Sequence, residues 1–304
     1  MLKKMTLTVL CAALFATAAN ADALKVVASF SIIGDMARQV GGNRVSVTTL
    51  VGPDSDAHVY EPKPQDAAAV AEADVVLVNG LGFEGFIQRL TQASPPKAQL
   101  VELTKGADLI RTGKGDHAHE NETDVESHGA DPHAFQSVSN ARLYVRNIAE
   151  AFCLADADAC EHFKMNASNY DAQLAALDEE IKAAVAAIPQ DKRTVITAHD
   201  AFGYFAHAYG LTFRAPEGVS TEAEASAADV AKLIDQVRAE KASALFVENI
   251  SDPRLITQIA NEAGIRVGGA LYSDALSAPD GPAATYIDMM RHNISTIAGA
   301  ISGS

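Results

Sequence analysis

Strand-like and helix-like segments alternate along this chain, and this alternation restricts its fold more than any other feature. Short apolar runs rich in β-branched residues are followed by segments with a helical pattern. Strands are predicted at residues 24–29, 45–51 and 74–79, and helices at residues 32–40, 66–73 and 83–92. Alternation of this kind predicts an α/β protein with parallel sheets and helices on both faces.

The second half of the chain echoes the first. Residues 27–41 can be laid over residues 196–210 so that glycines or alanines coincide at several positions, and residues 74–79 have a counterpart in residues 244–249. Two similar lobes in tandem would explain the echo. Any two strand–helix units could also show similarity this weak, so the echo only supports the prediction.

A long segment rich in Ala, Leu and Glu separates the two halves. Residues 161–188 predict one helix that stops at Pro189. At ~1.5 Å per residue this helix would extend about 40 Å, which is long enough to run past two lobes. We therefore expect an N-terminal lobe at residues 22–158, a linker helix at residues 159–189 and a C-terminal lobe at residues 190–304.

The first residues indicate export. Two lysines precede an apolar run at residues 5–19 and a small-x-small cleavage site at residues 19–21, which is typical of a secretory signal peptide. The run is shorter than the ~20 residues of a membrane-spanning helix. A lipid anchor on Cys11 is disfavoured because a large residue precedes it and the apolar run continues past it. We expect residues 1–21 to be removed and the mature protein to reside in the periplasm.

Charge and cysteine content narrow the class further. Removing residues 1–21 takes away two lysines and no acidic residue, which leaves 22 basic and 39 acidic residues and a net charge of −17. Such a surface repels nucleic acid and anionic lipid. Cleavage leaves Cys153 and Cys160, and in an oxidising compartment this pair predicts a local disulfide. Two buried thiols are the alternative.

Residues 113–132 interrupt the strand–helix pattern. They are polar and rich in His, Asp, Glu and Gly, which predicts a loop. Its His117, His119 and His128 could bind zinc weakly at the mouth of a cleft and pass it inward. A solvated acidic linker with incidental histidines explains the same composition equally well.

Four metal-capable side chains stand in turns or at strand ends. His58 follows the second predicted strand, His133 ends the polar loop, His199 lies at the carboxyl end of a strand, and Asp274 follows the last strand. Ligands of open α/β sheets bind beyond the carboxyl ends of the strands. Because each half of the chain carries two of the four, a cation held by all of them would join the lobes.

Three imidazoles and one carboxylate satisfy tetrahedral Zn2+, with Zn–N distances of ~2.0–2.1 Å. No two of the four residues have a metal-binding spacing, and each alone could be a capping or packing residue, so the prediction depends on the whole set.

Sequence context predicts roles for several other polar residues. A ligand histidine usually donates its second N–H to a carboxylate or carbonyl. Candidate acceptors, each equally interpretable as a surface or capping residue, are Glu61, Asp200, Glu222 and Glu248. The histidines in helical patterns, which are not expected to bind metal, are His162, His207 and His292.

The segments around the four candidate ligands resemble the signatures of the zinc/manganese solute-binding proteins of ABC transporters (cluster A-I). These segments are Asp-Ala-His58-Val-Tyr-Glu-Pro, Asp-Pro-His133-Ala-Phe, Ala-His199-Asp-Ala-Phe-Gly-Tyr-Phe and Leu-Tyr-Ser-Asp274-Ala-Leu. The resemblance covers essentially the whole mature chain. It implies two lobes on a stiff linker helix, little hinge motion, and one metal ion in the cleft with these four residues as ligands.

The third ligand position is expected to select the metal. Manganese-binding members of the family usually carry Glu there and zinc-binding members carry His, and imidazole suits Zn2+ better than a hard carboxylate does. His199 therefore favours Zn2+, with a manganese- or iron-binding receptor as the alternative. The implied partner is the membrane permease of an ABC importer. A periplasmic zinc chaperone is a further expected partner, and we expect a monomer.

A zinc hydrolase is the alternative from another class. Catalytic zinc normally has three protein ligands and a water molecule, whereas four protein donors leave no open position. The sequence also lacks His-Glu-x-x-His and Gly-x-Ser-x-Gly motifs. An adhesin or a metal buffer that works without a transporter is compatible with the same residues. We therefore expect a metal receptor and not an enzyme.

Overall fold

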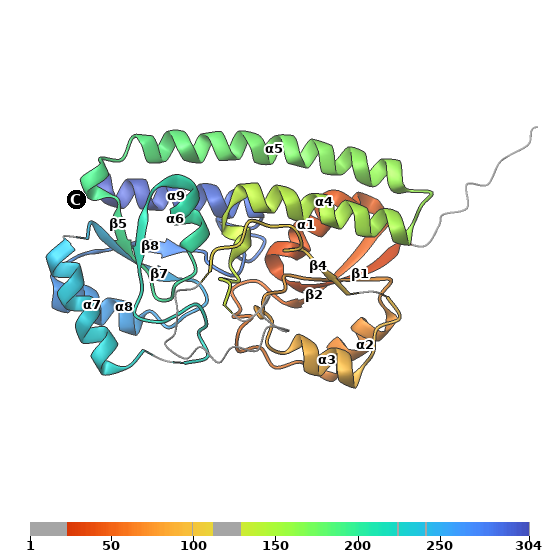
Figure 1. Cartoon of the computed structure of the whole chain (residues 1–304), viewed down its shortest axis with the longest axis horizontal. Helices are drawn as coiled ribbons and strands as arrows, with labels where there is room; N and C mark the ends of the chain where they lie inside the picture. The colour runs from red at the N-terminus through yellow and green to blue at the C-terminus, as the bar shows by residue number, and fades with distance from the viewer. Residues whose placement is uncertain (1–22, 99, 112–128, 224, 241, 304) are drawn as a thin grey trace, which may run out of the picture.

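Two α/β lobes lie side by side beneath one long helix in the computed structural model of the chain (Figure 1). The residues that the structure describes are 23–98, 100–111, 129–223, 225–240 and 242–303. The predicted signal peptide at residues 1–21 lies outside them. None of the described helices is both long and apolar enough to cross a membrane.

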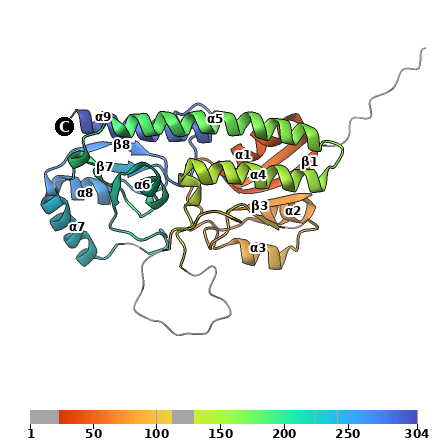
Figure 2. The same cartoon turned by 45° about the horizontal axis from the view of Figure 1, so that its top comes forward.

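The N-terminal lobe is built on a parallel sheet with the strand order β2-β1-β3-β4. Its elements are β1 (Leu24–Phe30), α1 (Ser31–Gly41), the 3-10 helix η1 (Gly42–Arg44), β2 (Val45–Val51), α2 (Pro64–Glu72), β3 (Val75–Val78), α3 (Ile87–Ala93), β4 (Leu100–Glu102), the 3-10 helix η2 (Ala134–Gln136) and α4 (Val138–Ala155). Figure 2 shows α1 and α4 on one side of this sheet and α2 and α3 on the other. All four residues of β3 are buried, as expected for a strand covered on both faces.

The C-terminal lobe repeats this plan, with the strand order β6-β5-β7-β8 and parallel pairing throughout. Its elements are the 3-10 helix η3 (Gln190–Lys192), β5 (Thr194–Ile196), α6 (Gly203–Tyr209), β6 (Thr212–Arg214), α7 (Ala227–Glu240), β7 (Ala244–Glu248), α8 (Arg254–Ala263), β8 (Val267–Leu271) and α9 (Tyr286–Ser302). The predicted α/β fold with two similar lobes is therefore confirmed.

Helix α5 (Cys160–Ala186) joins the lobes. Its 27 residues correspond to about 40 Å, and it packs on α1 and α4 of the first lobe and on α6 and α9 of the second. Its buried face repeats every three or four residues, as at Tyr170, Leu174 and Leu177. One apolar core runs from the first sheet through α5 to α9. Because the lobes share this core, the linker is a rigid support.

Two local features differ from the sequence prediction. The helix predicted at residues 83–92 begins only at Ile87. The buried Glu84 carboxylate accepts hydrogen bonds from the backbone N–H groups of Asn79 (2.6 Å) and Gly80 (3.2 Å). Because these bonds hold the segment around Glu84 in a turn, the helix cannot start there. Strand β4 was not predicted. With three residues, it is too short to show a period of its own.

Candidate metal centre

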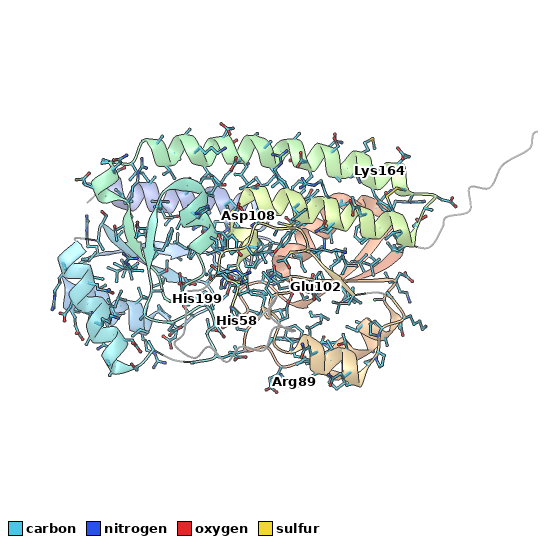
Figure 3. The ribbon with its side chains drawn as sticks, viewed as in Figure 1. His58, Arg89, Glu102, Asp108, Lys164 and His199 are labelled. Atoms are coloured by element: carbon cyan, nitrogen blue, oxygen red, sulfur yellow. A yellow bond between two sulfur atoms is a disulfide. The ribbon has the colours of Figure 1, made fainter. Side chains whose placement is uncertain are left out.

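The four predicted metal-binding side chains converge between the lobes. One ligand atom from each of His58, His133, His199 and Asp274 lies within 4.8 Å of the others. His58 is 7% exposed and the other three are fully buried. Figure 3 shows His58 and His199 meeting at the junction of the two lobes. Three of these residues lie in the segments that follow strands β2, β5 and β8: His58 is seven residues past β2, and His199 and Asp274 are each three residues past their strands, beyond the carboxyl ends of the two sheets.

The three imidazoles direct their Nε2 atoms at the Asp274 carboxylate. Oδ2 of Asp274 lies 3.1 Å from His199 Nε2 and 3.3 Å from His58 Nε2, and Oδ1 lies 3.5 Å from His133 Nε2. Donors bound to one tetrahedral ion at ~2.0–2.1 Å stand roughly 3.3 Å apart. The spacing of these atoms therefore suits a single small cation.

The N-terminal lobe holds His58 through its backbone and its ring. The backbone N–H of His58 donates to Asp56 Oδ1 (2.8 Å), and the other oxygen of Asp56 accepts from the Thr221 hydroxyl (2.5 Å) of the C-terminal lobe. The imidazole packs edge-on against the Phe83 ring, with centroids 4.8 Å apart. Beside it opens a cavity of about 290 Å3, whose lining also includes Glu222. His58, the one partly exposed member of the cluster, lies in the wall of this cavity.

Asp131 fixes His133. Its Oδ1 accepts from the His133 backbone N–H (2.9 Å) and lies 2.8 Å from His133 Nδ1. When the ring is neutral and its Nδ1–H donates to this carboxylate, Nε2 has its lone pair toward the centre. The other oxygen of Asp131 lies against Gly203, where an added Cβ would come within 2.6 Å. A side chain at position 203 would displace the carboxylate that orients His133.

Glu248, at the end of β7, fixes His199. Its Oε1 accepts from the backbone N–H groups of Ala198 (2.7 Å) and His199 (3.0 Å), and its Oε2 lies 2.7 Å from His199 Nδ1. All of these groups are buried. The same carboxylate therefore sets both the backbone and the ring of His199.

Electrostatics favours positive charge at this centre. Burial would lower the pKa of His133, but the carboxylates of Asp274 and Asp131 raise it to about 9. Burial opposes charge on His199 as well, yet Glu248 and Asp274 hold its pKa well above the usual value. Burial would raise the pKa of Asp274, but the two imidazoles hold it well below its usual range. The buried carboxylates therefore need positive charge beside them, which either the protonated histidines or a bound metal ion can supply.

Unpartnered atoms point to a metal ion. His58 Nε2, His133 Nε2 and Asp274 Oδ1 are buried without a hydrogen-bond partner, an arrangement that costs free energy unless another group satisfies them. All three face the centre. A cation bound here would satisfy them together, so the residues fit a bound metal.

The remaining predicted residues lie apart from the centre or support it. Of the carboxylates proposed as acceptors, Glu248 contacts a candidate ligand, whereas Glu61 and Asp200 are exposed. The helical histidines lie outside the cluster, on α5, α6 and α9. Asp131 was missed, although its spacing to His133 repeats that of Asp56 to His58 and could have revealed it. The loop residues His117, His119 and His128 lie outside the described residues.

The two lobes, the rigid linker and the metal-facing cluster define a substrate-binding protein for a metal ion. Residues 26–300 match the family described as zinc-uptake complex component A, periplasmic, and the chain belongs to this family. Its members are substrate-binding components of ABC transporters, so the chain is not an enzyme, and a zinc hydrolase is excluded.

Several known proteins are similar to the chain over nearly its whole length. The manganese-binding lipoprotein MntA of Halalkalibacterium halodurans is 35% identical, with 94% of this chain and 91% of that protein covered. The iron ABC transporter substrate-binding lipoprotein MtsA of Streptococcus pyogenes is 31% identical, with 97% and 94% covered. The structure of the periplasmic zinc binding protein TroA from Treponema pallidum aligns with a TM-score of 0.84 and 28% identity, covering 92% of this chain and 99% of that one.

Proposed function

We propose that the protein is a periplasmic zinc receptor that binds one Zn2+ through His58, His133, His199 and Asp274 and delivers it to the permease of an ABC importer. The observation that carries the proposal is the convergence of three imidazole Nε2 atoms on one carboxylate. Three nitrogen donors and one oxygen donor make a site that suits Zn2+ better than Mn2+, which prefers oxygen. Two of the imidazoles are held by carboxylates in the arrangement usual for zinc-bound histidine.

Manganese or iron is the second candidate cargo. It is favoured by the names of the two relatives described above, which are called manganese-binding and iron-transporting. Both oxygens of Asp274 face the centre, so this carboxylate could supply a second oxygen donor to a harder ion. The zinc-binding name belongs to a structural neighbour of lower sequence identity. Relatives thus support either metal, and the donor set of this chain favours zinc.

Metal competition tests the choice. The protein is purified without added metal, stripped with a chelator, and offered Zn2+ and Mn2+ together at equal free concentrations; bound metal is then counted by mass spectrometry. We expect one zinc per chain and little manganese. A chain that fills with manganese under these conditions would overturn the zinc assignment and leave the receptor function intact. His207→Ala is the matched control, because this exposed histidine on α6 lies outside the cluster.

Export and organisation are also part of the proposal. We propose cleavage after residue 21, lobes at residues 22–158 and 190–304, a linker at residues 159–189, and a monomeric mature protein that could also exchange zinc with a periplasmic chaperone. The mass of the protein from its native compartment tests the first point. A mature chain beginning at Asp22 is expected, whereas a lipid attached to Cys11 would replace a free receptor by an anchored one.

The polar loop is proposed as a collecting arm for zinc. Arg111, just before the loop, and Ala130, near its end, pair in an antiparallel bridge. Ala130 also lines the cavity beside His58. Deleting residues 116–129 and measuring the rate of zinc loading tests the idea. Slower loading with unchanged stoichiometry is expected, and unchanged loading would remove the arm from the proposal.

A further inference from the structure

Asp54 has an unusual backbone conformation close to the metal centre. It lies in the turn after β2, four residues before His58. Its φ of 51° falls in the left-handed region, which non-glycine residues seldom adopt. Within the described part of the chain, Leu81 is the only other non-glycine residue with positive φ. Such a conformation persists where surrounding contacts fix it, so the contacts of Asp54 should explain it.

Those contacts cross to the C-terminal lobe. The backbone N–H of Asp54 donates to the Leu276 carbonyl (2.9 Å). Its Oδ1 accepts from the Asn249 side-chain amide (3.0 Å), and its Oδ2 accepts from the Ala278 backbone N–H (3.3 Å). Both the unusual φ and the orientation of the carboxylate are therefore tied to residues of the other lobe.

The partners of Asp54 adjoin the metal-facing residues of that lobe. Leu276 and Ala278 follow Asp274 by two and four residues, and Asn249 directly follows Glu248, which orients His199. One exposed carboxylate thus connects the turn that carries His58 to the segments that carry Asp274 and Glu248.

Two further hydrogen bonds hold the segment after Asp274 in place. The Ser31 hydroxyl of the first lobe accepts from the Leu276 backbone N–H (2.9 Å), and the Asn249 amide also donates to the Ala275 carbonyl (3.2 Å). The segment is therefore fixed from both lobes at once. Asp54 itself is exposed and touches none of the four candidate ligands, so its side chain can be changed without altering them.

We propose that Asp54 is a positioning residue that acts as a latch between the lobes and slows release of the bound cation. The inference rests on the proposed function, because the latch matters only where both lobes hold one ion. For the ion to leave, the turn of His58 must separate from the segment of Asp274, and the hydrogen bonds of Asp54 oppose that separation. Two lost hydrogen bonds on an exposed side chain correspond to about a fivefold to tenfold faster release.

Two variants test the latch. Asp54→Gly removes both carboxylate acceptors and tolerates the positive φ. Asp54→Asn also tolerates this backbone and keeps one acceptor oxygen while losing the other. The dissociation rate is measured by mixing the zinc-loaded protein with excess chelator in a stopped-flow instrument. We expect the fastest release from the glycine variant, intermediate release from the asparagine variant, and unchanged release from Asp280→Asn, which alters an exposed aspartate next to the same segment.

Hydrogen exchange in the metal-free protein gives an independent readout. The backbone amides in residues 272–282 should exchange faster in Asp54→Gly, because the Ala278 N–H loses its acceptor. Unchanged exchange in Asp54→Gly would overturn the latch, whether or not the parent protein binds metal. Failure of the parent protein to bind any metal would overturn the proposed function and is a separate result. Faster exchange with release within twofold of the parent would show a purely structural contact and overturn the inference. Equal acceleration by Asp280→Asn would overturn it too.

Discussion

The two lobes support their metal-facing histidines by different means. In the N-terminal lobe, His58 and His133 each follow an aspartate by two residues, and each aspartate accepts from the backbone N–H of its own histidine. In the C-terminal lobe, the carboxylate that orients His199 comes from Glu248, 49 residues away on another strand. The first arrangement is a local turn, and the second exists only when β5 and β7 pair.

The two lobes also contribute unequal numbers of buried carboxylates to the metal centre. The C-terminal lobe places two buried carboxylates, Asp274 and Glu248, around one imidazole, whereas the N-terminal lobe places one buried carboxylate, Asp131, against one of its two imidazoles, that of His133. The C-terminal half therefore supplies most of the negative potential that attracts a cation. Substitutions there should cost more metal affinity than matching substitutions in the N-terminal half.

The largest effect on zinc affinity should come from removing a single metal-facing histidine, and its size should depend on which lobe carries that histidine. His199→Ala deletes a ligand and leaves the Glu248 carboxylate buried beside no imidazole. A quarter of the ~10–16 kcal/mol that holds a four-ligand zinc site is about a hundredfold or more in affinity. His58→Ala should cost less, because it strands no buried carboxylate in this way. Zinc affinities from competition titration would contradict the comparison if His58→Ala proved the more damaging change.

The pH dependence should show one titrating histidine in each lobe. The pKa of His133 is about 9 in the metal-free protein and that of His199 is also raised, so zinc must displace protons at neutral pH. Apparent affinity should fall about tenfold per pH unit below 9 for the proton displaced from His133, and the proton displaced from His199 should make the fall at neutral pH steeper. Calorimetric titration in buffers of different ionisation enthalpy counts these protons. Affinity that stays flat between pH 8 and pH 6 would exclude this proton–metal competition.

The contribution of His133 to the stability of the metal-free protein should follow the opposite trend with pH: it should fall as the pH rises, whereas zinc affinity should rise. The folded-state pKa of His133 lies above its ordinary value of 6.5, so its charged form stabilises the fold fully below about pH 6.5. That contribution is lost as the pH rises through about 9. Denaturant unfolding of the stripped protein at both ends of this range checks the sign.

Replacing the supporting carboxylates should have an intermediate effect. Glu248→Gln retains the shape but weakens the hold on His199, and changes of this kind typically cost about 10–100-fold in metal affinity. Asp131→Asn should fall at the lower end, because the turn before His133 keeps a side-chain oxygen that can accept its backbone N–H. Glu150→Gln on α4 is the control. A larger loss from Asp131→Asn would reverse the proposed division between the lobes.

Much of the fold and of the centre could be predicted from the sequence, because both depend on local patterns. The strand–helix alternation produced the two sheets, and the strand-end positions of His58, His199 and Asp274 indicated where they would meet. The short Asp-x-His turns carry a local signal as well. By contrast, nothing near Asp54 in the sequence marks it as more than a turn residue, since its partners lie 195 and 224 residues away. Contacts that depend on how two lobes sit together are not encoded in any one segment.

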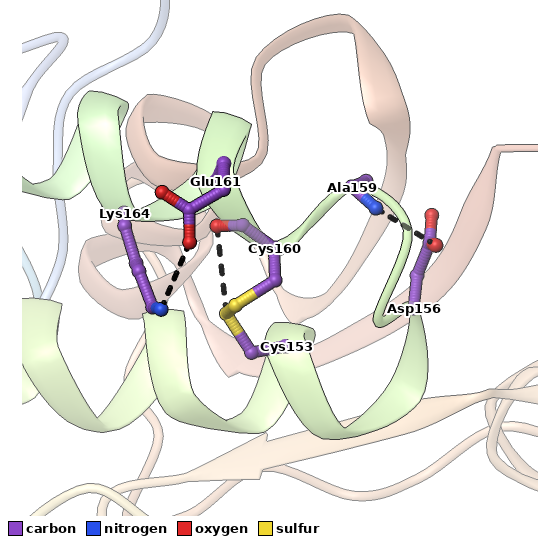
Figure 4. Close-up of a disulfide and its surroundings, with 6 residues drawn as sticks. All are labelled: Cys153, Asp156, Ala159, Cys160, Glu161 and Lys164. Atoms are coloured by element: carbon purple, nitrogen blue, oxygen red, sulfur yellow. Dashed lines mark hydrogen bonds and ion pairs between the residues drawn. A yellow bond between two sulfur atoms is a disulfide. The ribbon is translucent and has the colours of Figure 1, made fainter.

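The smallest effect on metal binding should come from removing the disulfide at the junction of α4 and α5. A disulfide joins Cys153 at the end of α4 to Cys160 at the start of α5, and the Ala159 N–H donates to Asp156 in the same turn (Figure 4). In Figure 3 the nearby Lys164 lies well away from His58 and His199. For a loop of seven residues, replacing both cysteines with serine should lower the free energy of unfolding by about 2–3 kcal/mol.

Zinc affinity should change less than about twofold in this double-serine variant, because the core shared by α5 and both lobes still positions the metal-facing residues. Denaturant unfolding and competition titration on the same samples separate the two quantities. The parent protein reduced with a thiol reagent is the control, because it loses the bond and keeps both sulfur atoms. A tenfold loss of affinity would mean that the α4–α5 corner sets the spacing of the lobes, and the metal centre would then depend on the N-terminal lobe more than on the C-terminal carboxylates.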